Sequence, residues 1–291
     1  MKKSYLFAAT AIMLWSTMPT VSKLLLGEMD SYKLLTLNAL FATVAMLVIN
    51  LCSRKWALMK RYRLKDYLKM AAIGLPGVFL YYIFFYGGSA RMPASQAFIV
   101  NYLWPIMSIV FACIVLKEKM TVRKIIAVVL SFCGVFTVAG SDLLQFNKDS
   151  VIGTLSCLGA AVCYGLYTAL NKKSSYDKQV SMTVATFTAF WPSLVITLLR
   201  GGDLLVIPAQ LPGIFWSGAV TMALANLSWA LALSTGNTAK ISNLAYITPF
   251  LSLVWTFFIL KEPIEPMSIL GLCIIVVGIF IQLKDGSRTK F

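Results

Sequence analysis

Long apolar runs separated by short polar connectors make up almost the whole chain. A helix rises about 1.5 Å per residue, so about 20 apolar residues are needed to cross about 30 Å of hydrocarbon. Strands of a membrane barrel would be shorter and would alternate in polarity, and these runs do neither. The pattern therefore predicts an all-α membrane protein with ten transmembrane helices, at 4–26, 33–53, 67–88, 94–116, 122–140, 151–171, 179–200, 212–235, 239–260 and 266–283.

Composition excludes an ordinary soluble protein. Hydrophobic residues make up 59% of the 291 residues and charged residues only 13%, whereas soluble domains carry about 25% charged residues. The chain has no His, which removes histidine triads and histidine-ligated metals. It also has no P-loop and no Gly-x-Ser-x-Gly motif. We therefore expect neither an enzyme nor a cofactor or metal site, and we interpret the six cysteines as small packing residues within the spans.

The basic residues predict the orientation of the chain. Ten spans place both termini on one side, and that side carries 20 of the 26 Lys and Arg residues, against 6 on the other. The positive-inside rule then puts both termini in the cytoplasm. The net charge of +15 is therefore a topological signal, and the expected partner is the lipid bilayer and not nucleic acid.

The second half of the chain repeats the first. Residues 101–134 align without a gap on residues 245–278, at a constant offset of 144, so that Pro105 meets Pro249 and Glu118 meets Glu262. A weaker match at an offset of 149 places Lys23 on Lys172. The repeat contains five spans, an odd number, so its second copy enters the membrane from the opposite side. Residues 1–140 and 151–291 are thus predicted to be inverted five-helix repeats, the architecture of secondary transporters.

Several of these features point to one family. The arrangement of five plus five spans, the Leu-Lys-Glu sequences at 116–118 and 260–262, and the glycine-bearing spans that follow them resemble the drug/metabolite transporter superfamily, EamA type. The resemblance covers the whole chain. Residues 15–18 (Trp-Ser-Thr-Met) and 101–105 (Asn-Tyr-Leu-Trp-Pro) further resemble the aromatic amino-acid exporter branch (YddG-like). Many members carry a small residue before each glutamate, where this chain has Lys117 and Lys261.

Polar and aromatic side chains gather near the middle of several spans. Trp and Tyr prefer the membrane interfaces, so their presence at mid-depth suggests a substrate site. The alternative is helix packing, with hydroxyls and amides bonded across spans. For Asn101 and Asn226 the site is favoured, because a midplane amide is costly without a polar partner. The candidate substrate-binding residues are Trp15, Ser16, Thr17, Tyr81, Tyr82, Asn101, Tyr102, Trp104, Tyr164, Tyr167, Asn226, Trp229, Tyr246 and Thr248.

Two prolines and two glutamates are candidates for gates or hinges. Pro105 and Pro249 interrupt spans four and nine at matching positions, where proline frees a carbonyl and bends the helix. A static kink is the alternative. Glu118 and Glu262 lie at span ends and are either gating groups or interfacial anchors in local ion pairs. The small residues Ala127, Gly134, Gly271 and Gly278 recur at spacing seven, which predicts close helix packing.

No Asp or Glu lies in the central part of any span, so the usual carboxylate proton relay is absent. We therefore predict a secondary active or facilitative transporter of the bacterial cytoplasmic (inner) membrane. It would export small zwitterionic metabolites, above all aromatic or hydrophobic amino acids, by alternating access through an uncharged aromatic cavity. A multidrug or organic-cation carrier, and a non-transporting scaffold or sensor, are the alternatives. The chain is expected to act as a monomer or a homodimer.

Overall fold

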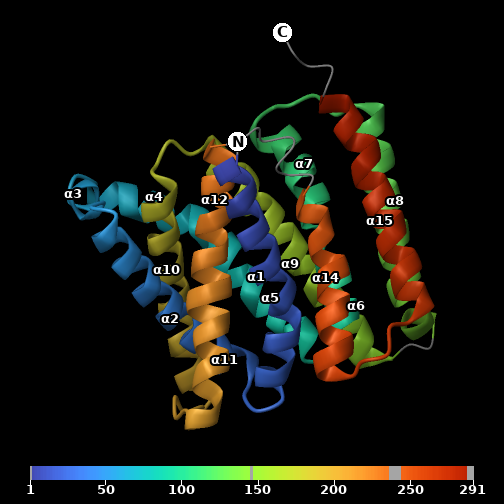
Figure 1. Cartoon of the computed structure of the whole chain (residues 1–291), viewed down its shortest axis with the longest axis horizontal. Helices are drawn as coiled ribbons and strands as arrows, with labels where there is room; N and C mark the ends of the chain where they lie inside the picture. Colours follow the sequence, from blue (N-terminus) through green and yellow to red (C-terminus); the bar gives the residue numbers. More distant parts are fainter. Residues whose placement is uncertain (1, 145–146, 236–243, 287–291) are drawn as a thin grey trace.

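The computed structural model describes residues 2–144, 147–235 and 244–286, and within these ranges it contains helices and connectors and no strand (Figure 1). The helices of the first half are α1 (Lys2–Leu26), α2 (Ser31–Cys52), the short α3 (Trp56–Met59), α4 (Leu64–Leu75), α5 (Tyr81–Ser89), α6 (Ala94–Asn101), α7 (Trp104–Val115) and α8 (Val122–Leu144). A π-helical segment, η1 (Pro76–Leu80), joins α4 to α5.

The second half contains α9 (Lys148–Lys173), α10 (Lys178–Leu199), α11 (Leu211–Phe215), α12 (Asn226–Thr235), α14 (Thr248–Trp255) and α15 (Pro266–Gly286). Two π-helical segments, η3 (Trp216–Ala225) and η5 (Thr256–Leu260), continue α11 and α14, and short 3₁₀ turns, η2 (Pro208–Gln210) and η4 (Ala245–Ile247), precede those helices. Helical structure thus lies at every place where a span was predicted, although residues 239–243 of the ninth span fall outside the described residues.

Six of these segments are long and apolar enough to cross a membrane. They are Ser31–Cys52, Leu64–Ser89, Ala94–Val115, Lys148–Lys173, Lys178–Leu199 and Pro208–Ala232. Two shorter apolar segments, Ala245–Leu260 and Pro266–Ile281, follow. The chain is therefore a multi-pass membrane protein, while the full count of ten crossings stays a prediction. Figure 1 shows that α1 begins and α15 ends at the same end of the bundle, as an even number of crossings requires.

Polar residues in the connectors fix where helices begin and end. Asp30 caps α2 by accepting from the backbone N–H groups of Tyr32 (2.8 Å) and Lys33 (3.2 Å), which satisfies donors that have no partner within the helix. Backbone conformation marks the ends of two other helical segments. Lys117, after α7, has φ of 57°, and Lys261, after η5, has φ of 58°. This left-handed conformation suits glycine better than a residue with a side chain.

The two halves of the chain are interleaved. The first helix, α1, packs against α12 and α14 of the second half, and α9 packs against α5, α6 and α7 of the first half. We refer to α1, α12 and α14 as the α1 group, and to α5, α6, α7 and α9 as the α9 group. Since each group contains helices from both halves, the two halves do not form separate bodies.

The last helices of the two halves form a close pair. α8 and α15 lie side by side along one edge of the bundle (Figure 1). A Cβ atom placed on Gly134 would lie 2.6 Å from the carbonyl oxygen of Gly271, and one placed on Gly278 would lie 2.9 Å from the carbonyl oxygen of Ala127. The close packing predicted from the spacing of these four residues is thus confirmed, and it pairs the two matching helices with one another.

Candidate functional site

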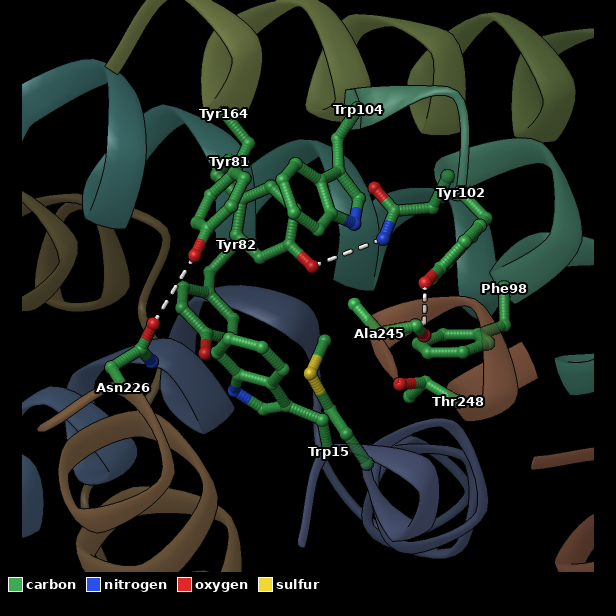
Figure 2. A pocket seen from close by; sticks show the side chains of 12 residues that line it. Trp15, Tyr81, Tyr82, Phe98, Tyr102, Trp104, Tyr164, Asn226, Ala245 and Thr248 are labelled. Atoms are coloured by element: carbon green, nitrogen blue, oxygen red, sulfur yellow. Dashed lines mark hydrogen bonds between the residues drawn. The ribbon is translucent and has the colours of Figure 1, made fainter. Parts of the chain in front are cut away.

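A small cavity lies where the α1 group meets the α9 group, and its lining is aromatic and uncharged (Figure 2). No Asp, Glu, Lys or Arg is among the described residues that surround it. Nine of the predicted site residues take part, together with three that were not predicted. The lining consists of Trp15, Met18, Tyr81, Tyr82, Phe98, Asn101, Tyr102, Trp104, Tyr164, Asn226, Ala245 and Thr248.

Aromatic rings from the α9 group form one wall of the cavity. The ring of Tyr164 on α9 lies 5.0 Å from the ring of Tyr81 and 5.1 Å from the indole of Trp104, measured between centroids. Trp15 of α1 lies opposite these rings (Figure 2), and Trp229 of α12 supports it at 5.5 Å. Rings at these separations stabilise one another. These contacts help to hold the aromatic side chains in position beside the cavity.

Two amides supply most of the polarity of the cavity. Asn226 accepts from the Tyr164 hydroxyl at 3.2 Å and donates to the carbonyl of Met222 at 2.9 Å, so both of its polar atoms are bonded. Asn101 donates to the Tyr81 hydroxyl at 3.0 Å, but its Oδ1 is buried without a partner. An unpaired buried acceptor costs about 1–3 kcal/mol. Asn101 Oδ1 is therefore an unused acceptor on a residue that lines the cavity.

Both prolines lie at breaks in the helices beside the cavity. α6 ends at Asn101 and α7 begins at Trp104, with Pro105 in its first turn, and Pro249 follows the η4 turn in the same way. Because proline has no N–H, Pro249 cannot bond to the carbonyl of Ala245, which accepts from the N–H of Thr248 instead. The Tyr102 hydroxyl donates to that carbonyl (Figure 2). This bond joins α6, in the α9 group, to the start of α14, in the α1 group.

The cavity is contracted in this conformation. Its free volume is about 40 Å³, which holds no more than about three water molecules. An amino acid with a large side chain would fit only after the rings of the two groups moved apart. The space between the rings in this structure is therefore too small for such a solute.

Five predicted site residues do not line the cavity. Ser16 is buried and accepts from the indole N–H of Trp255 at 2.9 Å, and Thr17 accepts from the indole N–H of Trp216 at 2.8 Å. The remaining three lie behind the wall or away from it. Tyr167 packs behind Tyr164 (5.7 Å between ring centroids), Trp229 packs against Trp15, and Tyr246 packs against Phe280 (5.8 Å).

Three lining residues were not predicted. Met18 and Phe98 are apolar side chains on helices already rich in them, and nothing in the sequence distinguishes them from packing residues. Ala245 contributes through its backbone carbonyl. The signal for it was present, because it stands four residues before Pro249 and proline was expected to free a carbonyl there.

The two candidate gating glutamates lie at opposite ends of the bundle and differ in their surroundings. Glu118 accepts from Lys172 at 3.2 Å and from Lys124 at 3.3 Å. Partial burial on its own would raise the pKa of Glu118, but the bonds and charges of these two lysines outweigh it and hold the pKa below its ordinary value. The expected local ion pair is thus present at Glu118. Glu262 instead accepts from backbone N–H groups at the start of α6.

Comparison with known proteins identifies the family. The model of the EamA-like transporter family matches the chain twice, over residues 2–140 and 151–283. The chain belongs to the EamA-like transporter family. An uncharacterized transporter of Clostridium kluyveri is 23% identical over an alignment that covers 100% of this chain and 96% of the relative. A protein of Streptantibioticus cattleyicolor named as a probable terminal-alkyne amino-acid exporter is 24% identical over 260 residues, or 87% of this chain and 85% of the relative.

A solved structure shares the fold of this EamA-family chain. It superimposes with a TM-score of 0.70, covers 100% of this chain and 99% of its own, and is 18% identical in sequence. At that identity the likeness shows the fold alone. Family membership and the apolar helices together show that the chain is a membrane transporter, while the solute it moves remains to be proposed.

Proposed function

We propose that this transporter exports small zwitterionic metabolites, in particular amino acids with aromatic or hydrophobic side chains, across the bacterial cytoplasmic membrane. The observation that carries the proposal is the cavity between the α1 and α9 groups. It combines aromatic faces with one buried, unpaired amide oxygen, Asn101 Oδ1, and no charged lining. The rings would stack on a planar side chain, and Asn101 would accept from an ammonium group.

Net charge favours an amino acid over an organic cation. Moving an isolated charge into a site of low dielectric constant is costly unless an opposite charge meets it. The described lining offers no such charge. A zwitterion is neutral as a whole, and its carboxylate and ammonium can each be met by neutral donors and acceptors, such as the Thr248 hydroxyl and Asn101.

The relatives support this class of solute. The Streptantibioticus protein bears the name of an amino-acid exporter, and amino acids remain zwitterionic at physiological pH. The 20-to-6 split of basic residues supports a cytoplasmic location for both termini, and 1–140 and 151–291 remain the proposed repeats. Glu118, Glu262 and the two proline breaks are proposed to take part in gating.

An organic-cation carrier is the second candidate function. It is favoured by one observation, namely that the described lining supplies aromatic faces but no Lys or Arg to receive a carboxylate. Aromatic faces bind quaternary ammonium ions by cation–π attraction.

Counterflow in proteoliposomes distinguishes the two. Vesicles preloaded with unlabelled phenylalanine should take up labelled phenylalanine, and phenethylamine, which has the same ring and ammonium but no carboxylate, should compete more weakly. Exchange of quaternary ammonium without exchange of phenylalanine or threonine would establish the second function instead. Absence of flux across a broad panel of solutes would refute both.

Two tryptophans provide a matched pair of variants. Trp15→Ala removes a wall of the cavity and should lower counterflow about three- to tenfold, the range expected from losing one aromatic contact. Trp191→Ala serves as the control, because Trp191 lies on α10 with 51% of its surface exposed and does not line the cavity. Asn101→Ala should lower counterflow as Trp15→Ala does. Unchanged flux in both cavity variants would refute the assignment of the site.

A further inference from the structure

An apolar groove runs along the side of the bundle formed by α2, α4 and α10. Both α2 and α4 pack against α10, and Figure 1 shows these helices at the edge of the bundle opposite α8 and α15. The groove has a free volume of about 390 Å³. Leu47, Leu68 and Phe187 in its lining are exposed, so the groove opens on the outer surface of the bundle. The complete lining is Thr43, Leu47, Met59, Tyr67, Leu68, Ala71, Thr183, Val184, Phe187 and Thr188.

The polar side chains of the groove are bonded within the protein. The hydroxyls of Thr43, Thr183 and Thr188 each donate to the carbonyl four residues earlier in the same helix, at 2.7, 3.0 and 2.7 Å. The Tyr67 hydroxyl donates to the carbonyl of Met59 at 2.7 Å. Since each of these donors is already used, the groove suits a hydrocarbon chain better than a polar solute.

A basic connector lies at one end of the groove. Met59, which lines the groove, is the last residue of α3, in the connector between α2 and α4. In the predicted orientation this connector faces the cytoplasm. Residues 54–69 contain one acidic residue, Asp66, and seven basic residues, namely Arg54, Lys55, Lys60, Arg61, Arg63, Lys65 and Lys69. This end of the groove therefore carries a strong positive charge.

The connector is anchored by one of its lysines, and other basic side chains stay free. Lys55 pairs with Asp177 of the α9–α10 connector at 2.6 Å. Lys60 and Arg61, which directly follow Met59, are exposed, and no carboxylate among the described residues lies within ion-pair distance of them. These two cations are therefore available to bind an anion from outside the protein.

We propose that the groove holds an acyl chain of an anionic phospholipid, such as phosphatidylglycerol, whose phosphate group binds Lys60 and Arg61. Lipid chains fill any apolar groove that opens on hydrocarbon, so the lining alone would not select a headgroup. The cations add that selection, because each Lys or Arg near an anionic membrane surface raises affinity roughly fivefold. The planar guanidinium of Arg61 also suits a phosphate, which it binds through two parallel N–H donors.

Charge also favours a lipid over a second copy of the chain. A symmetric dimer formed through this groove would bring the same basic connector of both copies side by side, and like charges that face one another oppose association. The site is separate from the aromatic cavity, because no described residue lines both. The lipid enters from the bilayer, so the site does not depend on the solute that is transported.

Lipid binding to the purified full chain in detergent tests the proposal. Native mass spectrometry measures how many lipids each protein molecule retains as dioleoyl phosphatidylglycerol or dioleoyl phosphatidylcholine is added. The two lipids have the same chains and differ in the charge of the headgroup. The first phosphatidylglycerol should bind about five- to thirtyfold more tightly, the range expected for one to two cations. Equal affinities would overturn the proposal.

Removal of the two cations should abolish the preference. Lys60→Gln combined with Arg61→Gln should lower the affinity for phosphatidylglycerol by the same factor and leave that for phosphatidylcholine unchanged. The matched control is Lys119→Gln combined with Lys173→Gln, which removes the same charge from two exposed lysines on the predicted cytoplasmic side that do not line the groove. An equal loss in the control would show that only total charge matters, and would overturn the proposal.

A pair of neighbouring alanines tests the groove itself without a change of charge. Ala71→Leu places a larger side chain in the groove and should lower the affinity for phosphatidylglycerol about fourfold or more, since each methylene excluded from burial costs about that factor. Ala72→Leu is the control, because Ala72 is exposed on the same helix and does not line the groove. Unchanged affinity in Ala71→Leu would overturn the proposal. A dimer that Ala71→Leu separates and added lipid does not would also overturn it, by assigning the groove to a second copy.

Discussion

Tyr102 and Pro249 are far apart in sequence, but both affect the hydrogen bonding of one carbonyl, that of Ala245. Pro249 cannot donate to the carbonyl of Ala245, which accepts from the N–H of Thr248 and, as a second donor, from the Tyr102 hydroxyl. Tyr102, Ala245 and the Pro249 ring are all buried. A side chain from the first half of the chain therefore bonds to the backbone of the second half at the cavity.

This relationship predicts a coupling between two substitutions. Tyr102→Phe should lower the stability of the protein by about 0.5–1.5 kcal/mol, because one buried hydrogen bond is lost while the carbonyl of Ala245 keeps the N–H of Thr248. In a Pro249→Ala background the new N–H can bond to Ala245, so the same substitution should cost clearly less. Thermal unfolding of the four proteins in detergent measures the coupling. Equal losses in both backgrounds would show that Tyr102 does not compensate for the proline.

The sequence predicted which types of residue line the cavity better than it predicted which way each side chain points. Placing each span at its midpoint gives the depth of a residue but not the side of the helix on which it lies. For that reason Ser16 and Thr17 were grouped with Trp15, although their hydroxyls bind the indoles of Trp255 and Trp216. Met18 was missed because an apolar residue among apolar residues carries no signal of its own.

Close contact between α8 and α15 depends on residues without side chains. The backbone of Gly134 approaches Gly271 and Ile275 so closely that there is no room for a methyl group. Small residues at such contacts allow helices to pack tightly in lipid, where the hydrophobic effect does not drive association. The spacing of small residues was sufficient to predict close packing on one face of each helix, but not that the two helices would pack against each other.

Gly134→Ala should lower thermal stability by about 1–3 kcal/mol, the usual cost of overpacking a well-packed contact. The matched control is Gly87→Ala on α5, where the nearest atom to the new Cβ would be 3.9 Å away. There, replacement of a helical glycine should be neutral or stabilising, because alanine favours the helix. Retention of monodisperse protein after heating measures both. Equal behaviour of the two variants would argue against a tight α8–α15 contact.

Other features of the elements could not be predicted. The π-helical segments η1, η3 and η5 differ from an α-helix by small changes in hydrogen bonding that leave no mark in apolar periodicity. The interruption between α6 and α7 was expected only as a kink at Pro105.

At the scale of the whole molecule, the order of the helices in sequence differs from their grouping in space. The repeat predicts two successive halves, whereas α1 packs with α12 and α14, and α9 packs with α5 and α7. Apolar patterns identify which segments enter the membrane, but they do not specify neighbours, since lipid and helix surfaces are about equally apolar. Partner choice is determined by shape and by a few polar contacts, such as those of Glu262 with the start of α6.

Reporter fusions test the predicted orientation. Alkaline phosphatase, which is active only outside the cytoplasm, should be active after Gly202, in the connector that follows α10, and inactive after Ser174, in the connector that follows α9. The imbalance of basic residues is the physical reason, because basic connectors stay in the cytoplasm. A fluorescent protein fused to the C-terminus should fluoresce. Reversed activities at the two internal sites would show that the chain has the opposite orientation.

The left-handed lysines after α7 and η5 have a consequence for mutational tolerance. Lys117 and Lys261 are both exposed, so a survey based on exposure alone would rank them among the most freely replaceable positions. Their positive φ angles impose a different selection, in which glycine and asparagine are accepted and valine, isoleucine and proline are rejected. Sequence variation at these two surface positions is thus restricted by the backbone, and its pattern should be the same at both.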